Sequence, residues 1–262
     1  MATVLLIGGH ARSGTTLLRH LCDSHRDMVV TNELDFLSGL GRGYTRHSLI
    51  LLRRLWGRTL NGVAFGYGIG PGMRGAAFAA RYLSALRRND GGVIDVASVE
   101  RALRTVFPQA CVVGDKTPHY VFLLDRVAGT PGLSCLIIYR DCRDVVSSML
   151  ERVRTVWRKR SWSRGADNAE KVATRWVRSM ELIERHQEQI CTVRYEDLVS
   201  RPRTELERVA RWLAVDPAGF AEARIRSVAT ASVGKYRTGL TQEELATVLH
   251  IAGPTMARLG YA

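Results

Sequence analysis

Short apolar segments that end in small or polar residues recur along the chain, and amphipathic helical patterns follow several of them. These segments are Val4–Ile7, Met28–Val30, Cys111–Val113, Leu133–Tyr139 and Ile190–Val193. Short buried strands that alternate with helices predict a parallel sheet covered on both faces. The sequence therefore predicts an α/β fold of three layers, with a central parallel sheet flanked by helices.

The polar residues that follow these strands are expected to meet at one edge of the sheet. In open parallel sheets the ligand lies at the carboxyl ends of the strands. The residues at these ends include Gly8, Gly9, Glu33, Lys116, Arg140 and Tyr195. We therefore expect the functional site at this edge.

Helical patterns outside the predicted strands cover much of the remaining chain. They lie at Ala76–Arg88, Val99–Phe107, Ala166–His186, Thr204–Leu213 and Gln242–Leu259. Between residues 39 and 75 the pattern changes, and glycines crowd residues 57–75 among apolar side chains. Because a loop this long is usually functional or disordered, we interpret this part as a mobile lid that faces the substrate. Plain surface irregularity is the alternative.

The overall composition limits the class of protein. The 262-residue chain has no linker, low-complexity tract or internal repeat, which predicts a single domain over residues 1–262. Its net charge of +13 indicates either a solvated basic surface or a polyanionic ligand. Apolar runs too short to cross a bilayer, a start without a basic region and five cysteines without C-x-x-C spacing predict a cytoplasmic protein with reduced thiols.

A glycine-rich loop follows the first predicted strand and opens a helix. Residues 9–16 have the frame G-x-x-x-x-G followed by two threonines, which is the spacing of a Walker A loop. The loop amides and the helix N-terminus form an anion cradle. Thr15 stands where a Walker A loop needs lysine, and Arg12 supplies a cation within the loop instead. The loop therefore predicts phosphate or sulfate binding, and the missing lysine argues against ATP-dependent phosphoryl transfer.

A second motif crosses from the fourth predicted strand into a helix, over Tyr139 to Met149. Arg140 at the strand end and Ser148 two helical turns later can share one phosphate. The serine donates from the helix face and the guanidinium supplies charge. The alternative is that Arg140 pairs with an acidic neighbour.

Together the two motifs resemble those of sulfotransferases that use 3′-phosphoadenosine 5′-phosphosulfate (PAPS). The loop is similar to the 5′-phosphosulfate loop, in the arginine version of the bacterial and tyrosylprotein branches. The resemblance implies that the residues that bind the 5′ side are Arg12, Ser13, Gly14, Thr15 and Thr16. Arg140 and Ser148 would bind the 3′-phosphate. The resemblance also implies a P-loop-like fold, PAPS as the co-substrate and no metal ion.

Glu33 is the candidate general base. It follows the second predicted strand, where a carboxylate can take the proton from an acceptor hydroxyl. It also matches the position of the proposed base in the tyrosylprotein branch. Other branches use a histidine, and His10 inside the loop is the rival base. A surface carboxylate without a catalytic role is the alternative for Glu33.

Lys116 is a candidate catalytic cation at the end of the third predicted strand. Thr117 resembles an N-cap and Pro118 a first helical position, so Lys116 lies at the end of the strand. A cation there can stabilise charge on the leaving oxygen, and the resemblance implies that this lysine contacts the sulfate. Arg12 and Lys116 are thus expected to hold the transferring group, unless Lys116 is a solvated surface lysine.

Three later segments carry weaker signals. Tyr195 either contacts the 3′-phosphate or packs in the core. The segment 233–237 resembles the basic loop that closes over the nucleotide in this family, which implies contacts from Lys235, Tyr236 and Arg237. The basic and aromatic segment 152–164 is compatible with single-stranded nucleic acid, a solvated face or the acceptor entrance.

The resemblance implies in-line transfer of a sulfuryl group from PAPS to a hydroxyl or amine. The acceptor is expected to be a small molecule, a carbohydrate or a lipid, faced by the variable segment 39–110. No nucleic acid partner is expected, and a homodimer is compatible with the sequence. The competing classes are an ATP-dependent P-loop small-molecule kinase and a basic nucleic-acid-binding module, the latter suggested by the positive charge.

Overall fold

A parallel sheet forms the centre of the protein. The structure, a computed structural model, describes residues 3–60, 75–88, 92–158 and 161–261. Its five strands, in the spatial order β2-β3-β1-β4-β5, all run parallel. They are β1 (Thr3–Gly8), β2 (Met28–Asn32), β3 (Val112–Lys116), β4 (Leu133–Tyr139) and β5 (Cys191–Arg194). Each predicted apolar segment forms one of these strands, so the predicted α/β class is confirmed.

The strand register brings the predicted site residues to the same level of the sheet. Ile7 of β1 and Asn32 of β2 both pair with Lys116 of β3. On its other side, β1 pairs Gly8 with Ile137 of β4. The glycine loop, the turn that carries Glu33 and the end of β4 therefore leave the sheet at one edge, as the sequence predicted.

Helices cover both faces of the sheet. The longer ones are α1 (Thr15–Cys22), α2 (Tyr44–Leu60), α3 (Gly75–Arg88), α4 (Val96–Val106), α6 (Cys142–Arg154), α7 (Ala169–Arg185), α9 (Pro202–Leu213) and α12 (Gln242–Arg258). The shorter ones are α5 (Leu124–Val127), α8 (Tyr195–Ser200), α10 (Glu222–Arg226), α11 (Tyr236–Gly239) and the 3₁₀ helices at Phe36–Gly39, Pro118–Leu123, Ser161–Gly165 and Pro217–Gly219. None of the helices in the described ranges is long and apolar enough to span a membrane.

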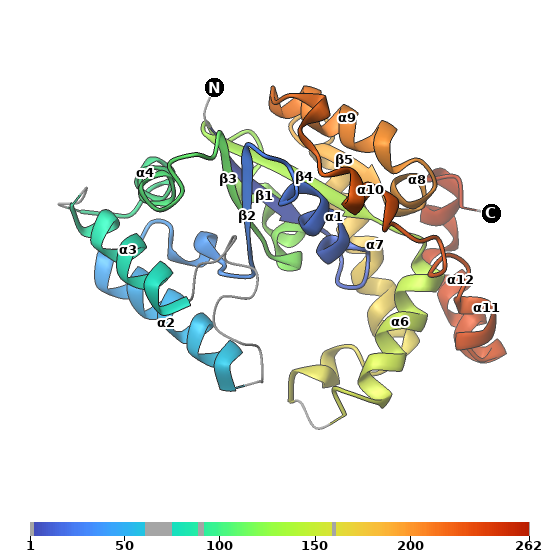
Figure 1. Ribbon diagram of the computed structural model, residues 1–262. Helices are drawn as coiled ribbons and strands as arrows, with labels where there is room; N and C mark the ends of the chain where they lie inside the picture. The colour runs from blue at the N-terminus through green and yellow to red at the C-terminus, as the bar shows by residue number, and fades with distance from the viewer. Residues whose placement is uncertain (1–2, 61–74, 89–91, 159–160, 262) are drawn as a thin grey trace.

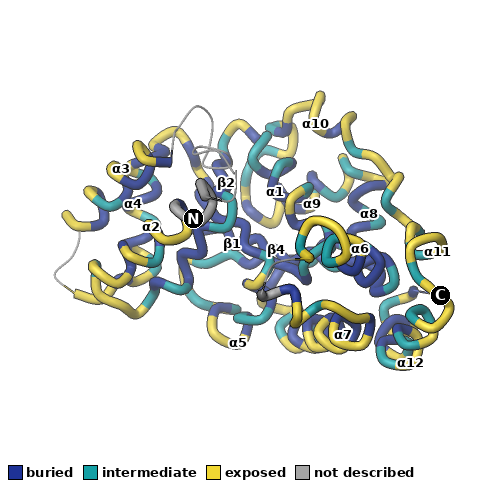
Figure 2. Tube along the Cα trace, turned by 90° about the horizontal axis from the view of Figure 1, so that it is seen from below, coloured by how far each residue is buried: buried dark blue, intermediate teal, exposed yellow. Residues whose placement is uncertain are grey.

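Alternating side chains of the strands feed two separate cores. Leu5 and Ile7 of β1 pack with α1, α8 and α9, whereas Val4 and Leu6 pack with α6, α7 and α12. This alternation follows from the two-residue period of a strand. Figure 2 shows the resulting layers, with the buried strands between α5, α7 and α12 on one side and α1, α9 and α10 on the other. Trp176 of α7 is fully buried in the second core.

Side chains of α2, α3 and α4 form a third core. These three helices lie together beside the sheet (Figure 1). Tyr82 of α3 stacks between Phe36 and Phe78, with ring centroids 5.4 and 5.5 Å away. Val29 of β2 and Val113 of β3 join this core, so it is continuous with the edge of the sheet. The aromatic stack thereby fixes α3 next to the strand that leads to Glu33.

The expectation of a long loop between residues 39 and 75 is wrong for residues 44–60, which form α2. Leu51 and Leu55 are buried four residues apart, so they lie on one helix face and pack in the third core. His47, one turn earlier on the same face, shares a 3.0 Å hydrogen bond with the hydroxyl of Tyr82. The remaining glycine-rich part of the predicted lid, residues 61–74, lies outside the described residues.

Predicted helix boundaries differ from the observed ones by up to three residues, because side-chain caps set the starts. The Asp95 side chain accepts the amide of Ser98, so α4 begins at Val96 rather than at the predicted residue 99. Asn168 caps α7 in the same way, and that helix begins at residue 169 rather than 166. Polar residues just before an apolar pattern therefore locate a start better than the pattern itself.

Gly114 in β3 tests the close packing of the central strands. A Cβ there would lie 2.3 Å from the carbonyl oxygen of Leu5 in β1. We expect Gly114→Ala to lower the free energy of unfolding by about 1–3 kcal/mol, as overpacking usually does. Gly165→Ala is the matched control, since a Cβ at that position meets nothing within 4 Å. Urea unfolding of both variants measures the difference, and equal stability would contradict the described pairing of β1 with β3.

Candidate active site

Glycines give the loop between β1 and α1 its shape. Gly9 has a φ of 154°, and a Cβ there would lie 2.3 Å from the carbonyl oxygen of Ile138 in β4. Gly14 precedes α1 with a φ of 96°, and a Cβ would lie 2.5 Å from the ring of Tyr195. The loop therefore lies tightly against β4 and α8. The first amides of α1 have no partners within the helix, so they are available to an anion.

A cavity of about 320 Å³ opens at this loop. The loop and the start of α1 contribute Ala11, Arg12, Gly14, Thr15, Thr16 and Leu17 to its wall. Other segments contribute Glu33, Lys116, Pro118, Arg140, Trp157, Tyr195 and Ser232. The structure thus brings the glycine loop, Arg140 and both predicted catalytic groups of the strand ends to one cavity, whereas Ser13 and Ser148 are not among the described residues that line it. Trp157 belongs to the basic segment 152–164, for which the acceptor entrance was one of the interpretations. Ser232, which lies just before the predicted basic loop, was missed.

Arg12 joins the two predicted phosphate motifs. Its Nε donates a 3.0 Å hydrogen bond to the hydroxyl of Ser148 in α6, although 136 residues separate them. Burial, together with the charges of Arg152 and Arg140, lowers the pKa of Arg12. Three arginines this close together create a positive potential around the Arg12 guanidinium, which favours a bound anion.

Arg140 lies at the end of β4, almost fully buried. Its guanidinium donates to the carbonyl oxygens of Arg12, at 3.3 Å, and Ser232. It also pairs with Asp144 at 3.2 Å and lies 4.5 Å from the ring centre of Tyr195. The alternative that Arg140 pairs with an acidic neighbour is therefore present in the structure. However, its Nε is buried without a hydrogen-bond partner among the described residues, so one donor is left for a ligand.

The basic loop before α11 is anchored to α6. The carboxylate of Asp144 accepts the backbone amides of Gly234, at 2.8 Å, and Tyr236, at 3.0 Å. Lys235, Tyr236 and Arg237 do not line the described cavity, in contrast to Ser232. The Tyr236 ring instead lies against Arg143, 4.5 Å from its guanidinium carbon. The nucleotide contacts of this segment stay a prediction.

Glu33 and Lys116 form an ion pair in the cavity. The Lys116 ammonium lies 2.7 Å from a carboxylate oxygen of Glu33 and 3.5 Å from the hydroxyl of Thr16. Only 2% of the Lys116 side chain is exposed, compared with 43% for Glu33. Lys116 is therefore not a solvated surface lysine. Both side chains line the cavity, and the buried ammonium contacts the Glu33 carboxylate as well as Thr16 at the start of α1.

Backbone strain occurs at two of the predicted catalytic residues. Non-glycine residues with positive φ in the described ranges are Arg12, Glu33, Asp35 and Ala214. Arg12 has a φ of 74° and Glu33 of 56°. Such conformations cost about 1–3 kcal/mol each and occur most often at functional sites.

His10, the rival base, lies in a different environment. Its ring is 1% exposed and does not line the cavity. Its Nδ1 donates to the carbonyl of Ala11 at 2.8 Å, and the ring packs edge-on against Phe122. Burial lowers the pKa of His10 to about 4. A proton acceptor for a bound substrate has to be within reach of it, so this geometry favours Glu33.

Neighbouring parts of the site differ in detail from the sequence analysis. Thr117 occupies the N-cap position of a 3₁₀ helix, but its hydroxyl donates to Asp115 instead of capping. Tyr195 both packs in a core and lines the cavity, so the two alternatives for it are compatible. Trp157 lines the cavity as well, but residues 159–160 of the basic segment lie outside the described residues.

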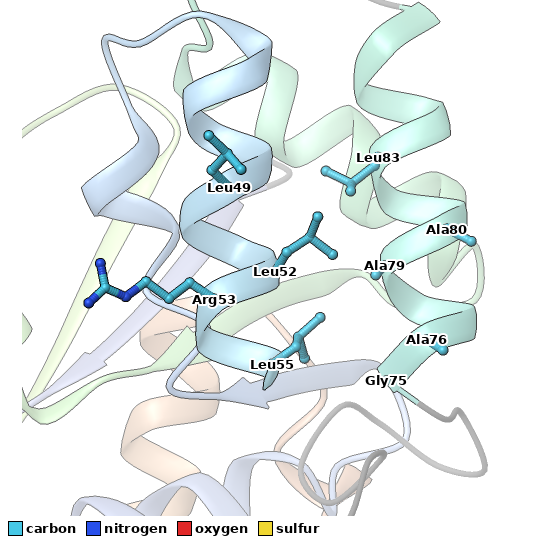
Figure 3. Close-up of a pocket in the computed structure, with 9 residues that line it drawn as sticks. All are labelled: Leu49, Leu52, Arg53, Leu55, Gly75, Ala76, Ala79, Ala80 and Leu83. Atoms are coloured by element: carbon cyan, nitrogen blue, oxygen red, sulfur yellow. The ribbon is translucent and has the colours of Figure 1, made fainter. Parts of the chain in front are cut away.

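A second, apolar cavity lies between α2 and α3 (Figure 3). It measures about 760 Å³ and is walled mainly by leucines and alanines of the two helices. Arg53, the one charged residue among the described residues of its wall, points away from the leucines. The next residue, Arg54, pairs at 2.5 Å with Asp35, which lies two residues after Glu33. This ion pair connects α2 to the turn that carries Glu33.

Potential metal ligands do not gather at the site. Within the described ranges, no group of three or more His, Cys, Asp or Glu side chains could hold a metal ion. The described acids at the site are instead paired with arginines, lysine or backbone amides.

The parallel sheet and the glycine loop between β1 and α1 define a protein with a P-loop-like α/β fold. A sequence model described as "Sulfotransferase family" matches residues 5–218. The chain therefore belongs to the sulfotransferase family, which confirms the resemblance of its two phosphate motifs.

Known relatives are distant. Nodulation protein NoeE of Sinorhizobium fredii is 27% identical over 293 aligned positions, which cover 97% of this chain. The chain spans 64% of the length of that relative. Among solved structures, the sulfotransferase domain from the curacin biosynthetic pathway superposes with a TM-score of 0.58, at 16% identity, over 100% of this chain and 99% of that chain. Sulfotransferase STF9 from Mycobacterium avium has a TM-score of 0.54, at 17% identity, over 98% and 76%. These likenesses show the fold.

The buried His10 makes stability depend on pH. Its pKa is about 4 in the folded protein and 6.5 as a reference for the unfolded chain, so the unfolded chain binds the proton first as the pH falls. The contribution of the neutral ring to the free energy of unfolding is fully present above pH 6.5 and is lost as the pH falls toward 4. We expect the free energy of unfolding to fall by about 2 kcal/mol between pH 7 and pH 5 because of this ring. The His10→Asn variant should lack this part of the pH dependence.

Urea unfolding at the two pH values measures this difference. His250→Asn, at an exposed position, is the control and should keep the pH dependence of the unchanged protein. A His10→Asn variant with the full pH dependence would show that His10 is not buried as a neutral ring.

Proposed function

We propose that the protein transfers a sulfuryl group from PAPS to a hydroxyl or amine of its acceptor. The observation that carries this proposal is the Glu33–Lys116 ion pair, which lines the same cavity as the anion-binding loop. A proton acceptor and a buried cation thus lie next to a cradle for phosphate and sulfate. Family membership supports a sulfotransferase reaction.

The residues at the loop suit a donor with phosphate groups at both ends. The amides of residues 14–16 and the Arg12 guanidinium would bind the 5′ side, whereas the Ser13 amide donates to the His10 carbonyl at 3.1 Å. Arg140, whose buried Nε has no hydrogen-bond partner among the described residues, and Ser148 would bind the 3′-phosphate. Ser13 also has a buried hydroxyl without a hydrogen-bond partner among the described residues. These unfilled donors support a bound anion, because buried polar groups are normally satisfied.

Transfer exchanges one sulfur–oxygen bond for another. The acceptor oxygen bonds to sulfur while the bond from sulfur to the 5′-phosphate oxygen breaks, which leaves a sulfate ester and adenosine 3′,5′-bisphosphate. The Glu33 carboxylate takes the acceptor proton. Lys116 and Arg12 stabilise the negative charge that develops on the oxygen that leaves with the 5′-phosphate. The ion pair with Lys116 would hold the Glu33 carboxylate in place within the cavity.

The acceptor side involves the segment 39–110. The Arg54–Asp35 ion pair couples α2 of this segment to the Glu33 turn, which supports a role in acceptor recognition. The acceptor would be a small molecule, a carbohydrate or a lipid. An ATP-dependent kinase is the alternative enzyme, but Thr15 leaves the loop without the lysine that phosphoryl transfer from ATP uses.

Glu33→Gln tests the role of the base. The amide keeps the size of the side chain but cannot accept the proton, so we expect turnover with labelled PAPS to fall about 100-fold or more. The affinity for adenosine 3′,5′-bisphosphate should stay within about twofold, since the nucleotide is bound by other residues. Glu188→Gln, an exposed glutamate, is the control and should leave turnover unchanged. Full turnover in Glu33→Gln would remove this residue from its role.

Arg140→Ala tests the assignment of the 3′-phosphate. Removing a charge-assisted contact should weaken binding of adenosine 3′,5′-bisphosphate by about 10- to 100-fold but leave adenosine 5′-monophosphate almost unaffected. Calorimetry of both nucleotides gives the ratio, which is insensitive to a general loss of structure. Arg178→Ala, an exposed arginine, is the control. An equal loss for both nucleotides would contradict the assignment.

A further inference from the structure

The carboxylate of Asp115 is the most densely bonded acid next to the site. It lies in β3, directly before Lys116, and is fully buried. Its Oδ1 accepts the Thr31 hydroxyl at 2.8 Å and the Leu34 amide at 3.0 Å. Its Oδ2 accepts the Asp35 amide at 3.1 Å, the Thr117 hydroxyl at 2.8 Å and the Tyr120 hydroxyl at 2.7 Å.

These bonds enclose the turn that carries Glu33. The Leu34 and Asp35 amides follow Glu33 directly, and the Glu33 amide itself donates to the Lys116 carbonyl at 2.6 Å. Glu33 and Asp35 have φ values of 56° and 57°. Because each such conformation costs about 1–3 kcal/mol in a non-glycine residue, the turn needs partners that hold it. The Asp115 carboxylate provides two hydrogen bonds for this purpose, one to the Leu34 amide and one to the Asp35 amide.

We propose that Asp115 is a positioning residue that holds the Glu33 carboxylate against Lys116. This inference rests on the proposed function, in which Glu33 takes the acceptor proton. Neighbouring residues of a strand point to opposite faces, so β3 holds the turn with the side chain of Asp115 and offers the ammonium of Lys116 on its other side. One strand end thus fixes both members of the catalytic pair.

The geometry of the position requires a side chain that accepts hydrogen bonds at both of its oxygens. Its five partners are three hydroxyls and two backbone amides, and the amides cannot accept a hydrogen bond. The Thr31 hydroxyl also lies 3.0 Å from the Gly114 carbonyl oxygen, so its one hydrogen is shared between two acceptors. Burial and the negative charge of Asp115 raise the pKa of Tyr120, which keeps that hydroxyl a neutral donor. A carboxylate is an acceptor at both oxygens, whereas the amide of asparagine is an acceptor at only one.

Asp115→Asn is therefore the informative substitution. In either orientation, the new amide nitrogen faces the Leu34 amide or the Asp35 amide, so one bond to the turn is lost. We expect kcat to fall about 10- to 100-fold through misplacement of Glu33, as small displacements of catalytic groups do. KM for PAPS and the affinity for adenosine 3′,5′-bisphosphate should stay within about twofold. Rates are expressed per nucleotide-binding site counted by calorimetry, so unfolded material does not contribute.

Tyr120→Phe is the matched control. It removes one donor from Asp115 but leaves both amide bonds to the turn, so kcat should stay within about threefold of the unchanged protein. The Asp115→Asn and Glu33→Gln double variant separates positioning from a general structural role. If Asp115 acts through Glu33, adding Asp115→Asn to Glu33→Gln should change the residual rate by less than about threefold. A structural defect would lower the residual rate by the full factor again.

The outcomes distinguish this inference from the proposed function. Loss of kcat in Asp115→Asn that vanishes in the Glu33→Gln background supports it. Unchanged kcat in Asp115→Asn, or full additivity, overturns it even where Glu33→Gln abolishes transfer. If the unchanged protein transfers nothing from PAPS, or if Glu33→Gln keeps full turnover, the proposed function or its base is wrong instead.

Hydrogen exchange provides a test that does not depend on a stable variant. In the unchanged protein with bound adenosine 3′,5′-bisphosphate, the Leu34 and Asp35 amides should be protected to a degree similar to the amides of β2, because both are bonded to a buried carboxylate. Exchange at the rate of an unprotected surface loop would overturn the inference.

Discussion

The parallel register of β2, β3 and β1 is the constraint on which the site depends. Lys116 pairs with Ile7 on one side and with Asn32 on the other, so the loop and the Glu33 turn begin at the same level. A slip by one residue would turn Lys116 to the other face of the sheet. It would also turn Asp115 away from the turn that it holds. The chemistry at the edge thus follows from the packing of the strands.

Acidic and cationic side chains make different kinds of contact around the cavity. Asp115 and Asp144 are buried and hold the backbone amides of two loops, one beside Glu33 and one beside Arg140. Arg12, Arg140 and Lys116 line the cavity, where Lys116 pairs with Glu33 and Arg140 also pairs with Asp144. Arg12 illustrates the effect, because burial and the neighbouring charges of Arg152 and Arg140 lower its pKa. Part of the basic excess behind the net charge of +13 therefore lies at this cavity.

The sequence predicted what depends on local pattern. The apolar strands, the glycine loop and the polar residues at the strand ends could be read directly, since each signal lies within about ten residues of chain. The helix over residues 44–60 was missed because the glycines that follow it suggested a loop, although Leu51 and Leu55 have helical spacing.

Roles that depend on distant contacts could not be predicted. Asp115 is 81 residues from Leu34, and Asp144 is 90 residues from Gly234. In the sequence each is an acid next to a basic residue, which more often indicates a surface ion pair. His10 and Glu33 were both plausible bases from residue type alone. The burial of His10 in the core, which depends on Phe122 and its neighbours, distinguishes them.

The most direct test of the account is a calorimetric titration of the unchanged protein with adenosine 3′,5′-bisphosphate in buffer that contains a chelator. If two anion sites bind the two phosphate groups of one nucleotide, it should bind at one site per chain. Its affinity should be about tenfold or more higher than that of adenosine 5′-monophosphate. Absence of binding by folded protein, or equal affinity for the two nucleotides, would contradict the account.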